Sequence, residues 1–425
     1  MSSAVAIVVL YTVSKQTIMN DFPIDTIRED FPLLKAQVNK TRLVYFDNAA
    51  TTQKPVQVID TIDNLYRNQN SSIHRSVNYL SGKMTEAYEG ARETVRRFVH
   101  ANNSREIIFT AGATASINLV ATSFGEAFIE EGDEVLVSAM EHHSNIVPWQ
   151  LLCDRKKARL KVLPVNDIGE LQMDQLPILL TERTRLIAVT QVSNAMGVIN
   201  PVNEIIRQAH EKNIPVLIDG AQSIQHGQIN VQEMDCDFYV FSGHKVYGPT
   251  GIGVLYGKEK WLEAMPPYQG GGDMIDRVSF SGTSFNVLPF KFEAGTTNYV
   301  GAIALGAALE YIEHIGLDHI DAYEIALNDY AGNALRSIPG IRIFGDSKMK
   351  HPIFSFLLEN IHPYDAGMVL DKLGIAIRTG THCAMPLMEH FGIDGTIRAS
   401  MCFYNTKEEV DRFVEGINTV QEMFG

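Results

Sequence analysis

A chain of 425 residues is too long for one small hydrophobic core and predicts two domains, or one large domain with a smaller one. Its 45% hydrophobic and 20% charged residues are typical of a globular protein, and a net charge of −14 argues against binding to nucleic acid or to an anionic membrane. The four cysteines show no Cys-x-x-Cys spacing, which excludes a disulfide framework and a cysteine-rich zinc site and favours a reducing, cytoplasmic location.

The N-terminus carries an apolar run, Ala4 to Val13, which has the length of a signal-peptide core and is too short to span a bilayer. No basic residue precedes this run, and a second methionine, Met19, lies directly before a well-patterned segment. We therefore expect residues 1–18 to form a disordered or loosely attached extension. The alternative is a cleaved targeting peptide.

The following segment predicts three helices and one short strand. Residues 21–37 carry apolar side chains at helical spacing and predict a short amphipathic helix. A brief strand at 44–46 leads into a polar loop of small residues at 47–52. Two further helical patterns cover 55–67 and 84–98.

From residue 106 onward, strands and helices alternate. Strands are expected at 107–109, 135–138, 186–192, 216–218 and 239–241, with helices at 116–130, 145–157 and 202–212. The strand segments are apolar on consecutive residues, which indicates burial on both faces and predicts an α/β fold with a mostly parallel central sheet flanked by helices. Another long helix is expected at 302–316. We place the boundary there, between a large domain (19–300) and a smaller C-terminal α+β domain (301–425).

Polar residues follow the predicted strands, at the carboxyl edge where ligands bind in an open α/β sheet. The first strand leads to Thr114 at the start of a helix, where free backbone N–H groups and a hydroxyl form an anion site. The next four strands lead to His142, Asn194, Asp219 and Lys245. Taken singly, Asp219 could be a helix cap, His142 an exposed histidine and Lys245 a surface lysine in the turn between two strands.

Together, these side chains are the parts required to hold pyridoxal phosphate. This cofactor needs a lysine for a Schiff base, an acid against the pyridinium nitrogen and donors for the phosphate. A lysine held at a strand end by low-dielectric packing loses its proton more easily and becomes a nucleophilic amine. A dinucleotide site is not expected, because no Gly-x-Gly-x-x-Gly follows a strand and opens a helix.

Three motifs stand at these strand ends: Glu141-His-His-Ser-Asn-Ile-Val-Pro-Trp149, Asp219-Gly-Ala-Gln222 and Ser242-Gly-His-Lys245. They resemble the fold-type I pyridoxal-phosphate enzymes of aminotransferase class V and, more narrowly, the SufS-type (group II) cysteine desulfurases. The similarity runs from about Phe22 to the C-terminus.

This resemblance implies a role for each cofactor-binding residue. Lys245 would form the Schiff base, Asp219 would pair with the pyridine nitrogen and His142 would stack on the ring. Gln222 would bind the phenolic oxygen. The phosphate would be held by Thr114, Ser242 and His244, and Thr296 would reach the phosphate of the neighbouring subunit, which implies a homodimer.

The resemblance also implies the substrate-binding residues and the nucleophile. Asn194 and Arg398, with Arg378, would hold the substrate carboxylate, for which a guanidinium fork is suited. Cys383 lies in a polar loop next to a histidine and near Arg378, which would favour the thiolate. A generic cysteine is more often inert and buried, and the other three have less reactive surroundings: Cys153, Cys236 and Cys402.

The predicted function is a pyridoxal-phosphate-dependent cysteine desulfurase, which converts L-cysteine to L-alanine through a persulfide on Cys383 for iron–sulfur cluster assembly. Because the cysteine loop is short, a sulfur-acceptor protein of the SufE or SufU type would have to bring its own thiol to the pocket. The alternatives are a selenocysteine lyase, a class V aminotransferase, which has no use for Cys383, and a cofactor-bearing sulfur-transfer scaffold.

Two loops depart from the family pattern. The family commonly has Thr-Arg-Gly-Thr-Thr-Glu at the phosphate loop, where this chain has Thr110-Ala-Gly-Ala-Thr-Ala115, so one hydroxyl and two charges are missing. The cysteine loop commonly reads Gly-His-His-Cys-Ala-Gln-Pro, where Thr381 and Met385 stand in this chain. Neither change removes a primary catalytic group.

Overall fold

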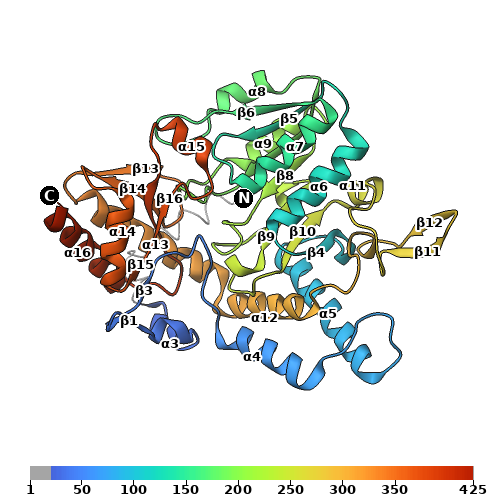
Figure 1. Cartoon of the computed structure of the whole chain (residues 1–425), viewed down its shortest axis with the longest axis horizontal. Helices are drawn as coiled ribbons and strands as arrows, with labels where there is room; N and C mark the ends of the chain where they lie inside the picture. Colours follow the sequence, from blue (N-terminus) through green and yellow to red (C-terminus); the bar gives the residue numbers. More distant parts are fainter. Residues whose placement is uncertain (1–20, 425) are drawn as a thin grey trace, which may run out of the picture.

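A computed structural model of the chain describes residues 21–424. The predicted extension at 1–18 and the second methionine lie outside the described residues. A seven-stranded sheet, in the order β4-β10-β9-β8-β7-β5-β6, forms the centre of the larger part (Figure 1). Its strands are β4 (Ile107–Thr110), β5 (Glu134–Ser138), β6 (Arg159–Leu163), β7 (Thr184–Thr190), β8 (Val216–Asp219), β9 (Phe238–Ser242) and β10 (Gly253–Gly257).

The sheet is mostly parallel, as the alternating pattern predicts. Strands β6, β5, β7, β8 and β9 pair in parallel, whereas β10 runs antiparallel to both of its neighbours, β9 and β4. Every residue of β5, β8, β9 and β10 is buried. Burial of both faces explains why these strands read as continuous apolar runs in the sequence.

Helices cover both faces of this sheet (Figure 1). Alternate strand residues point to opposite faces, so Val135 and Val137 join one hydrophobic core and Leu136 joins the other. The first core includes residues of α6 (Ala113–Phe128) and α7 (Val147–Lys156). The second core includes residues of α5 (Tyr79–Phe98), α9 (Val202–His210) and α12 (Tyr299–Ile315).

Two helices and one strand differ most from the prediction. The segment expected as one helix at 21–37 forms α3 (Ile24–Glu29) and a 3-10 turn at Pro32–Lys35, because Phe31 is extended before the proline. Helix α5 begins at Tyr79 rather than at residue 84, since the Asn78 side chain caps it by accepting from the Ser81 N–H. Strand β6 has no counterpart in the prediction, because this edge strand exposes Arg159.

The smaller part is built on a four-stranded antiparallel sheet, in the order β13-β14-β17-β16. These strands are β13 (Ile341–Phe344), β14 (Ile353–Leu358), β16 (Arg378–Gly380) and β17 (Thr396–Ser400). Its helices are α13 (Leu317–Arg336), α14 (Pro363–Lys372), α15 (Met385–His390) and α16 (Lys407–Phe424).

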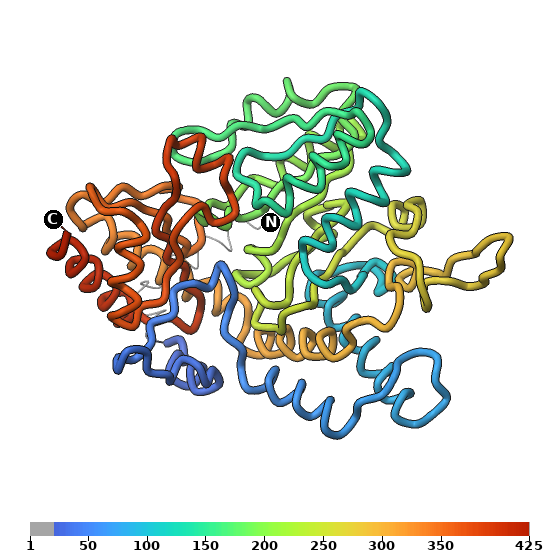
Figure 2. Tube along the Cα trace, in the orientation of Figure 1, coloured from blue at the N-terminus to red at the C-terminus, as the bar shows by residue number. Residues whose placement is uncertain are grey.

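The N-terminal arm joins the two parts. Strand β3 (Val44–Tyr45) pairs in parallel with β15 (Ile375–Ala376), so this early segment lies beside the smaller part (Figure 2). The chain then passes through residues 47–54 to α4 (Val56–Asn64), which packs against α12. The domain boundary near residue 300 stays a prediction.

The remaining described elements are short. They include a hairpin of β11 (Ile275–Ser279) and β12 (Gly282–Phe285), which projects from the body in Figure 1 and exposes Val278 and Phe280. The others are β1 (Gln37–Val38), β2 (Thr41–Arg42), α8 (Leu176–Leu179), α10 (Val231–Met234) and α11 (Glu259–Ala264). Between residues 21 and 424, no single helix is long and apolar enough to cross a membrane; α12 and α13 pass that test only as a pair, which is bent by 75°.

Candidate active site

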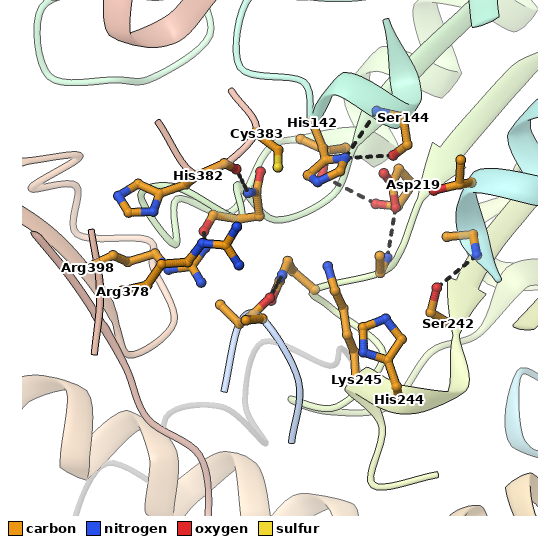
Figure 3. Close-up of a pocket in the computed structure, with 18 residues that line it drawn as sticks. His142, Ser144, Asp219, Ser242, His244, Lys245, Arg378, His382, Cys383 and Arg398 are labelled. Atoms are coloured by element: carbon orange, nitrogen blue, oxygen red, sulfur yellow. Dashed lines mark hydrogen bonds between the residues drawn. The ribbon is translucent and has the colours of Figure 1, made fainter. Parts of the chain in front are cut away.

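A pocket lies at the carboxyl ends of the parallel strands, where the smaller part faces the sheet (Figure 3). Its lining contains eleven of the twelve predicted site residues: Thr114, His142, Asn194, Asp219, Gln222, Ser242, His244, Lys245, Arg378, Cys383 and Arg398. The twelfth, Thr296, is exposed and lies outside this lining. Its contact with a neighbouring subunit stays a prediction.

Lys245 lies in the 3-10 turn Gly243–Lys245 directly after β9. The turn is tight, since a Cβ at Gly243 would stand 2.7 Å from the Ile252 Cγ2. The His244 carbonyl accepts hydrogen bonds from the Thr52 N–H (3.1 Å) and from the Lys54 ammonium (2.9 Å). The N-terminal arm therefore fixes the backbone beside the lysine.

Burial lowers the pKa of Lys245 from 10.5 to about 8. The nearby carboxylate of Asp219 opposes this shift, whereas the positive charges of Arg398 and Arg378 add to it. The amine is therefore far easier to deprotonate than an exposed lysine.

Asp219 is the last residue of β8 and is buried. Its Oδ1 accepts from the Ala221 N–H at 2.9 Å, which fixes the side chain in the loop. Burial raises the pKa of this carboxyl group, and the Ala221 N–H and the charge of Lys245 oppose the rise. The acid and the lysine therefore influence each other's pKa, and both line the pocket.

His142 is oriented by its own loop. Its Nδ1 accepts from the Ser144 N–H at 3.1 Å and lies 2.8 Å from the Ser144 Oγ. Burial, together with the charge of Lys245, lowers the pKa of His142 to about 3. The ring is therefore neutral, and a neutral imidazole is suited to stack on an aromatic cofactor.

Hydrogen bonds at helical spacing explain the motif around His142. Buried Glu141 accepts from the Asn145 side chain (2.7 Å) and from the Thr190 N–H of β7 (2.9 Å). Asn145 in turn accepts from the Trp149 indole N–H at 2.9 Å. This chain of polar contacts ties the loop after β5 to the end of β7 and holds His142 in place.

The N-terminus of α6 forms the anion-binding end of the pocket. Gly112, at a φ of 149°, lets the loop approach β10 so closely that a Cβ on Gly253 would stand 2.4 Å from the Gly112 Cα. The Ser242 Oγ accepts from the Ala113 N–H at 2.8 Å. Thr114 follows in the first turn, and the helix dipole favours a negative group there.

Arg398 supplies the opposite, substrate-facing end. It is buried in β17 and donates from Nη2 to the Asp47 Oδ1 and from Nη1 to the Asn194 carbonyl, each at 2.9 Å. Arg378 stands opposite it in the register of β16 and β17. The Asn194 side chain itself donates to the His382 carbonyl at 2.6 Å, so the amide holds the cysteine loop.

Cys383 is half-buried in the loop between β16 and α15. Both His382 and Cys383 have positive φ angles, 53° and 56°, which are sparsely populated by residues other than glycine. Burial lowers the pKa of His382 to about 2, so its ring is neutral. The adjacent histidine therefore adds no positive charge beside Cys383, and its effect on the thiolate stays a prediction. The cations that line the pocket with Cys383 are Lys245, Arg378 and Arg398.

The other three cysteines are buried, in agreement with the prediction of less reactive surroundings. Burial raises the pKa of Cys153 to about 11 and raises those of Cys236 and Cys402 further. A raised thiol pKa disfavours the nucleophilic thiolate. This leaves Cys383 as the thiol that faces the pocket among the described residues.

The pocket residues fit pyridoxal phosphate. Lys245 and Asp219 supply the amine and the acid, and the start of α6 with Ser242 supplies phosphate donors. Two buried polar atoms of lining residues, the Gln222 Oε1 and the Arg398 Nε, have no hydrogen-bond partner within the described chain. Such atoms are expected where a polar ligand completes the site.

Sequence reasoning missed two residues that organise the site. Asp47 pairs with Arg398, and Lys54 holds the backbone next to Lys245. Both belong to the polar segment after the strand at 44–46. The polar composition of that segment was the one feature of the sequence that could have indicated a role in the site. Their roles depend on pairing between distant segments, which no local pattern contains.

Comparisons with known proteins agree with this geometry. The aminotransferase class-V family matches residues 44–413. A cysteine desulfurase of Pectobacterium atrosepticum is 49% identical over 405 residues, covering 95% of this chain and 99% of that protein. The crystal structure of the Escherichia coli cysteine desulfurase CsdA (S-sulfonic acid) superimposes with a TM-score of 0.88 at 38% identity, covering 95% of this chain and 100% of that one. The apo cysteine desulfurase of Thermococcus onnurineus NA1 gives 0.89 at 36% identity, covering 94% and 98%.

Proposed function

The chain belongs to the aminotransferase class V family, within its cysteine desulfurases, and we propose that it converts L-cysteine to L-alanine and retains the sulfur as a persulfide on Cys383. These similarities confirm the predicted family and fold class and favour none of the alternative functions. One observation carries the residue assignments: Lys245 from a strand end and Cys383 from the smaller part line the same pocket (Figure 3).

The cofactor would be held by the larger part of the pocket. Lys245 would bind its aldehyde, Asp219 its ring nitrogen and His142 its ring face, while the start of α6 with Ser242 would bind its phosphate. Pyridoxal phosphate, when bound, supplies an electron sink for the substrate α-carbon. Asp219 serves that chemistry because its carboxylate keeps the ring nitrogen protonated.

Substrate orientation and proton transfer fall to two buried basic side chains. Arg398, fixed by Asp47 and by the Asn194 carbonyl, binds the substrate carboxylate. The Lys245 amine, with its pKa lowered to about 8, removes the α-proton as a general base. A pKa near the working pH is what a general base needs.

The sulfur step belongs to Cys383. Its thiolate attacks the substrate sulfur, so that an S–S bond forms while the substrate C–S bond breaks. The electron pair of that C–S bond stays on the β-carbon, which takes up a proton and becomes the methyl group of alanine, and the Lys245 ammonium returns a proton to the α-carbon. The enzyme is left as the persulfide Cys383–S–SH. Arg378 and Arg398 line the pocket together with this thiol.

A second protein would collect the sulfur. Only four residues, 381–384, separate β16 from α15, and hydrogen bonds to His143 and Asn194 tether them. A short, tethered loop cannot swing far outward, so an acceptor of the SufE or SufU type would bring its thiol to the pocket for iron–sulfur cluster assembly.

A homodimer would bring Thr296 to the neighbouring phosphate, and the exposed apolar side chains of the β11–β12 hairpin support such an association.

The test compares the wild-type protein with Cys383→Ala, using Cys153→Ala as a matched control. Each is incubated with L-cysteine, alanine is quantified, and the persulfide is located by mass spectrometry. We expect alanine and a persulfide on Cys383 in the wild type and in the control, and neither product at a comparable rate in Cys383→Ala, which keeps its cofactor absorbance. A protein-bound persulfide that persists in Cys383→Ala would contradict the assignment.

Borohydride reduction distinguishes the enzyme from a scaffold. The proposal expects a pyridoxyl adduct on Lys245 together with alanine release. An adduct without any alanine from cysteine would instead indicate a cofactor-bearing scaffold.

A further inference from the structure

His143 contacts the cysteine loop at two points, at the nucleophile and two residues after it. Its backbone N–H donates to the Cys383 carbonyl at 2.8 Å. Its side chain acts two residues further on, where the Nε2 accepts from the Met385 N–H at 3.1 Å. The loop after β5 in the larger part therefore holds the residue that carries the thiol and the residue that begins α15.

The side-chain contact satisfies a helix terminus that has no local cap. Met385 is the first residue of α15, and the preceding Ala384 has no side chain that can cap the helix. The first N–H groups of a helix lack partners inside the helix, so an acceptor from elsewhere stabilises this end. Because the contact uses the main chain of Met385, the departure from the family pattern at that position leaves it intact.

The contact also defines which atom of the ring matters. The Met385 N–H donates, so Nε2 must be an unprotonated acceptor. A glutamine can place an amide oxygen at a similar distance from the backbone, whereas alanine cannot. The role of the ring can therefore be separated from the role of the His143 backbone, which every variant keeps.

Backbone conformation makes such a clamp necessary. His382 and Cys383 both have positive φ angles, and a residue in that region persists only when its surroundings hold it. Asn194 fixes the His382 carbonyl, so the clamp on the far side of the thiol falls to His143. A thiol misplaced by about 1 Å can cost on the order of 100-fold in rate.

We propose that His143 is a positioning residue, which clamps the loop so that the Cys383 thiol faces the bound substrate. The inference rests on the proposed function for its effect on turnover, but the clamp itself exists whether or not the protein turns over cysteine. His143 does not line the pocket, so it acts through Cys383 rather than on the substrate.

The test uses the holoenzyme with His143→Ala, His143→Gln and His390→Ala. His390 is an exposed histidine at the end of α15, the helix whose first N–H group His143 accepts from. The alkylation rate of Cys383 by iodoacetamide is followed by mass spectrometry, and kcat and KM for L-cysteine are measured. In His143→Ala we expect alkylation to rise roughly 5-fold, the factor that loss of one ordinary hydrogen bond allows. We expect kcat to fall about 10-fold with KM little changed, because Arg398 is untouched.

His143→Gln should restore alkylation and kcat most of the way to wild type, and His390→Ala should match the wild type. Wild-type alkylation in His143→Ala would overturn the clamp, and so would equal losses in the Ala and Gln variants. If the alanine variant does not fold, His143→Gln still tests the clamp. An alkylation rate in His143→Gln as high as that of the unfolded protein would overturn it as well. Failure of the wild type to form alanine would refute the proposed function, while the alkylation rates would still test the clamp.

Discussion

The two sides of the pocket are fixed in different ways. On the sheet side, Asp219 and His142 are held by N–H groups two residues away, and Lys245 directly follows a buried strand. On the opposite side, Arg398 depends on Asp47, 351 residues away, and the Cys383 loop depends on residues that follow β5 and β7. The cofactor side is thus encoded mostly by local sequence, whereas the reacting side is assembled by contacts between distant segments.

This difference separates two properties of the enzyme. Most groups of the sheet side are fixed by their own strands and loops, and only the backbone beside Lys245 depends on the N-terminal arm. The cysteine side works only when the N-terminal arm and the loops of the sheet hold it in place. Substitutions on the first side should therefore affect the cofactor, and those on the second should affect the substrate and the sulfur.

Lys245→Ala gives the largest expected effect, because it removes the cofactor-attachment group of the sheet side. Loss of both the attachment group and the general base should lower alanine formation by at least about 10³-fold. Borohydride reduction followed by peptide mapping should find no pyridoxyl adduct, whereas the exposed control Lys40→Ala should keep it. An undiminished adduct in Lys245→Ala would place the attachment at another lysine.

The second prediction concerns the pH at which this lysine reacts. A pKa lowered from 10.5 to about 8 makes the neutral amine about 300-fold more abundant at pH 7 than in an ordinary lysine. Trapping of pyridoxal phosphate on the apoprotein with cyanoborohydride should therefore rise with pH and reach half its maximum near 8. The amine is protonated and unreactive below that pH, and neutral above it.

Two variants determine the sign of each electrostatic influence on Lys245. Arg398→Met removes a cation and should move the midpoint to higher pH, whereas Asp219→Asn removes the opposing carboxylate and should move it to lower pH. A wild-type midpoint near 10.5 would show that burial does not act on this lysine.

Much of the sheet side could be predicted from the sequence, because strand, turn and polar residue are adjacent along the chain. Asp219 and Lys245 follow apolar runs directly, and the carboxyl edge of a parallel sheet brings such residues together. The strand β6 was missed, because an edge strand that exposes Arg159 lacks a continuous apolar run.

The cysteine side could be predicted only in part. Resemblance to a family identified Cys383 and Arg398, but the pairing of Arg398 with Asp47 depends on β3 joining β15. The neutral state of His382 was also hidden, because burial by distant residues decides it. Local sequence contains neither the partner nor the burial.

Arg398→Lys tests the reacting side with a smaller effect. The guanidinium donates to Asp47 and to the Asn194 carbonyl and still presents a fork to a carboxylate, whereas an ammonium is a point charge on a flexible stem. Loss of a bidentate, charge-assisted contact should raise KM for L-cysteine by about 10- to 100-fold. Cofactor absorbance should stay unchanged, as should both parameters in the exposed control Arg342→Lys. A lower affinity for the cofactor, with an unchanged KM for L-cysteine, would contradict the division between the two sides.

The smallest expected effect returns to the sheet side, at the phosphate loop. Ala113 is buried, lines the pocket and stands where the family commonly has a threonine. Ala113→Thr would add one hydroxyl beside the Ser242 Oγ, and one new hydrogen bond to the phosphate should tighten cofactor binding by about 3- to 10-fold, measured as Kd by equilibrium dialysis. The control Ala115→Thr lies outside the pocket lining and should leave Kd unchanged. If Ala113→Thr instead weakens cofactor binding, we would infer that the Ser242 Oγ and the Ala113 N–H already fill the space that the threonine occupies in the family. The alanine would then reflect a differently packed loop rather than the loss of a phosphate ligand.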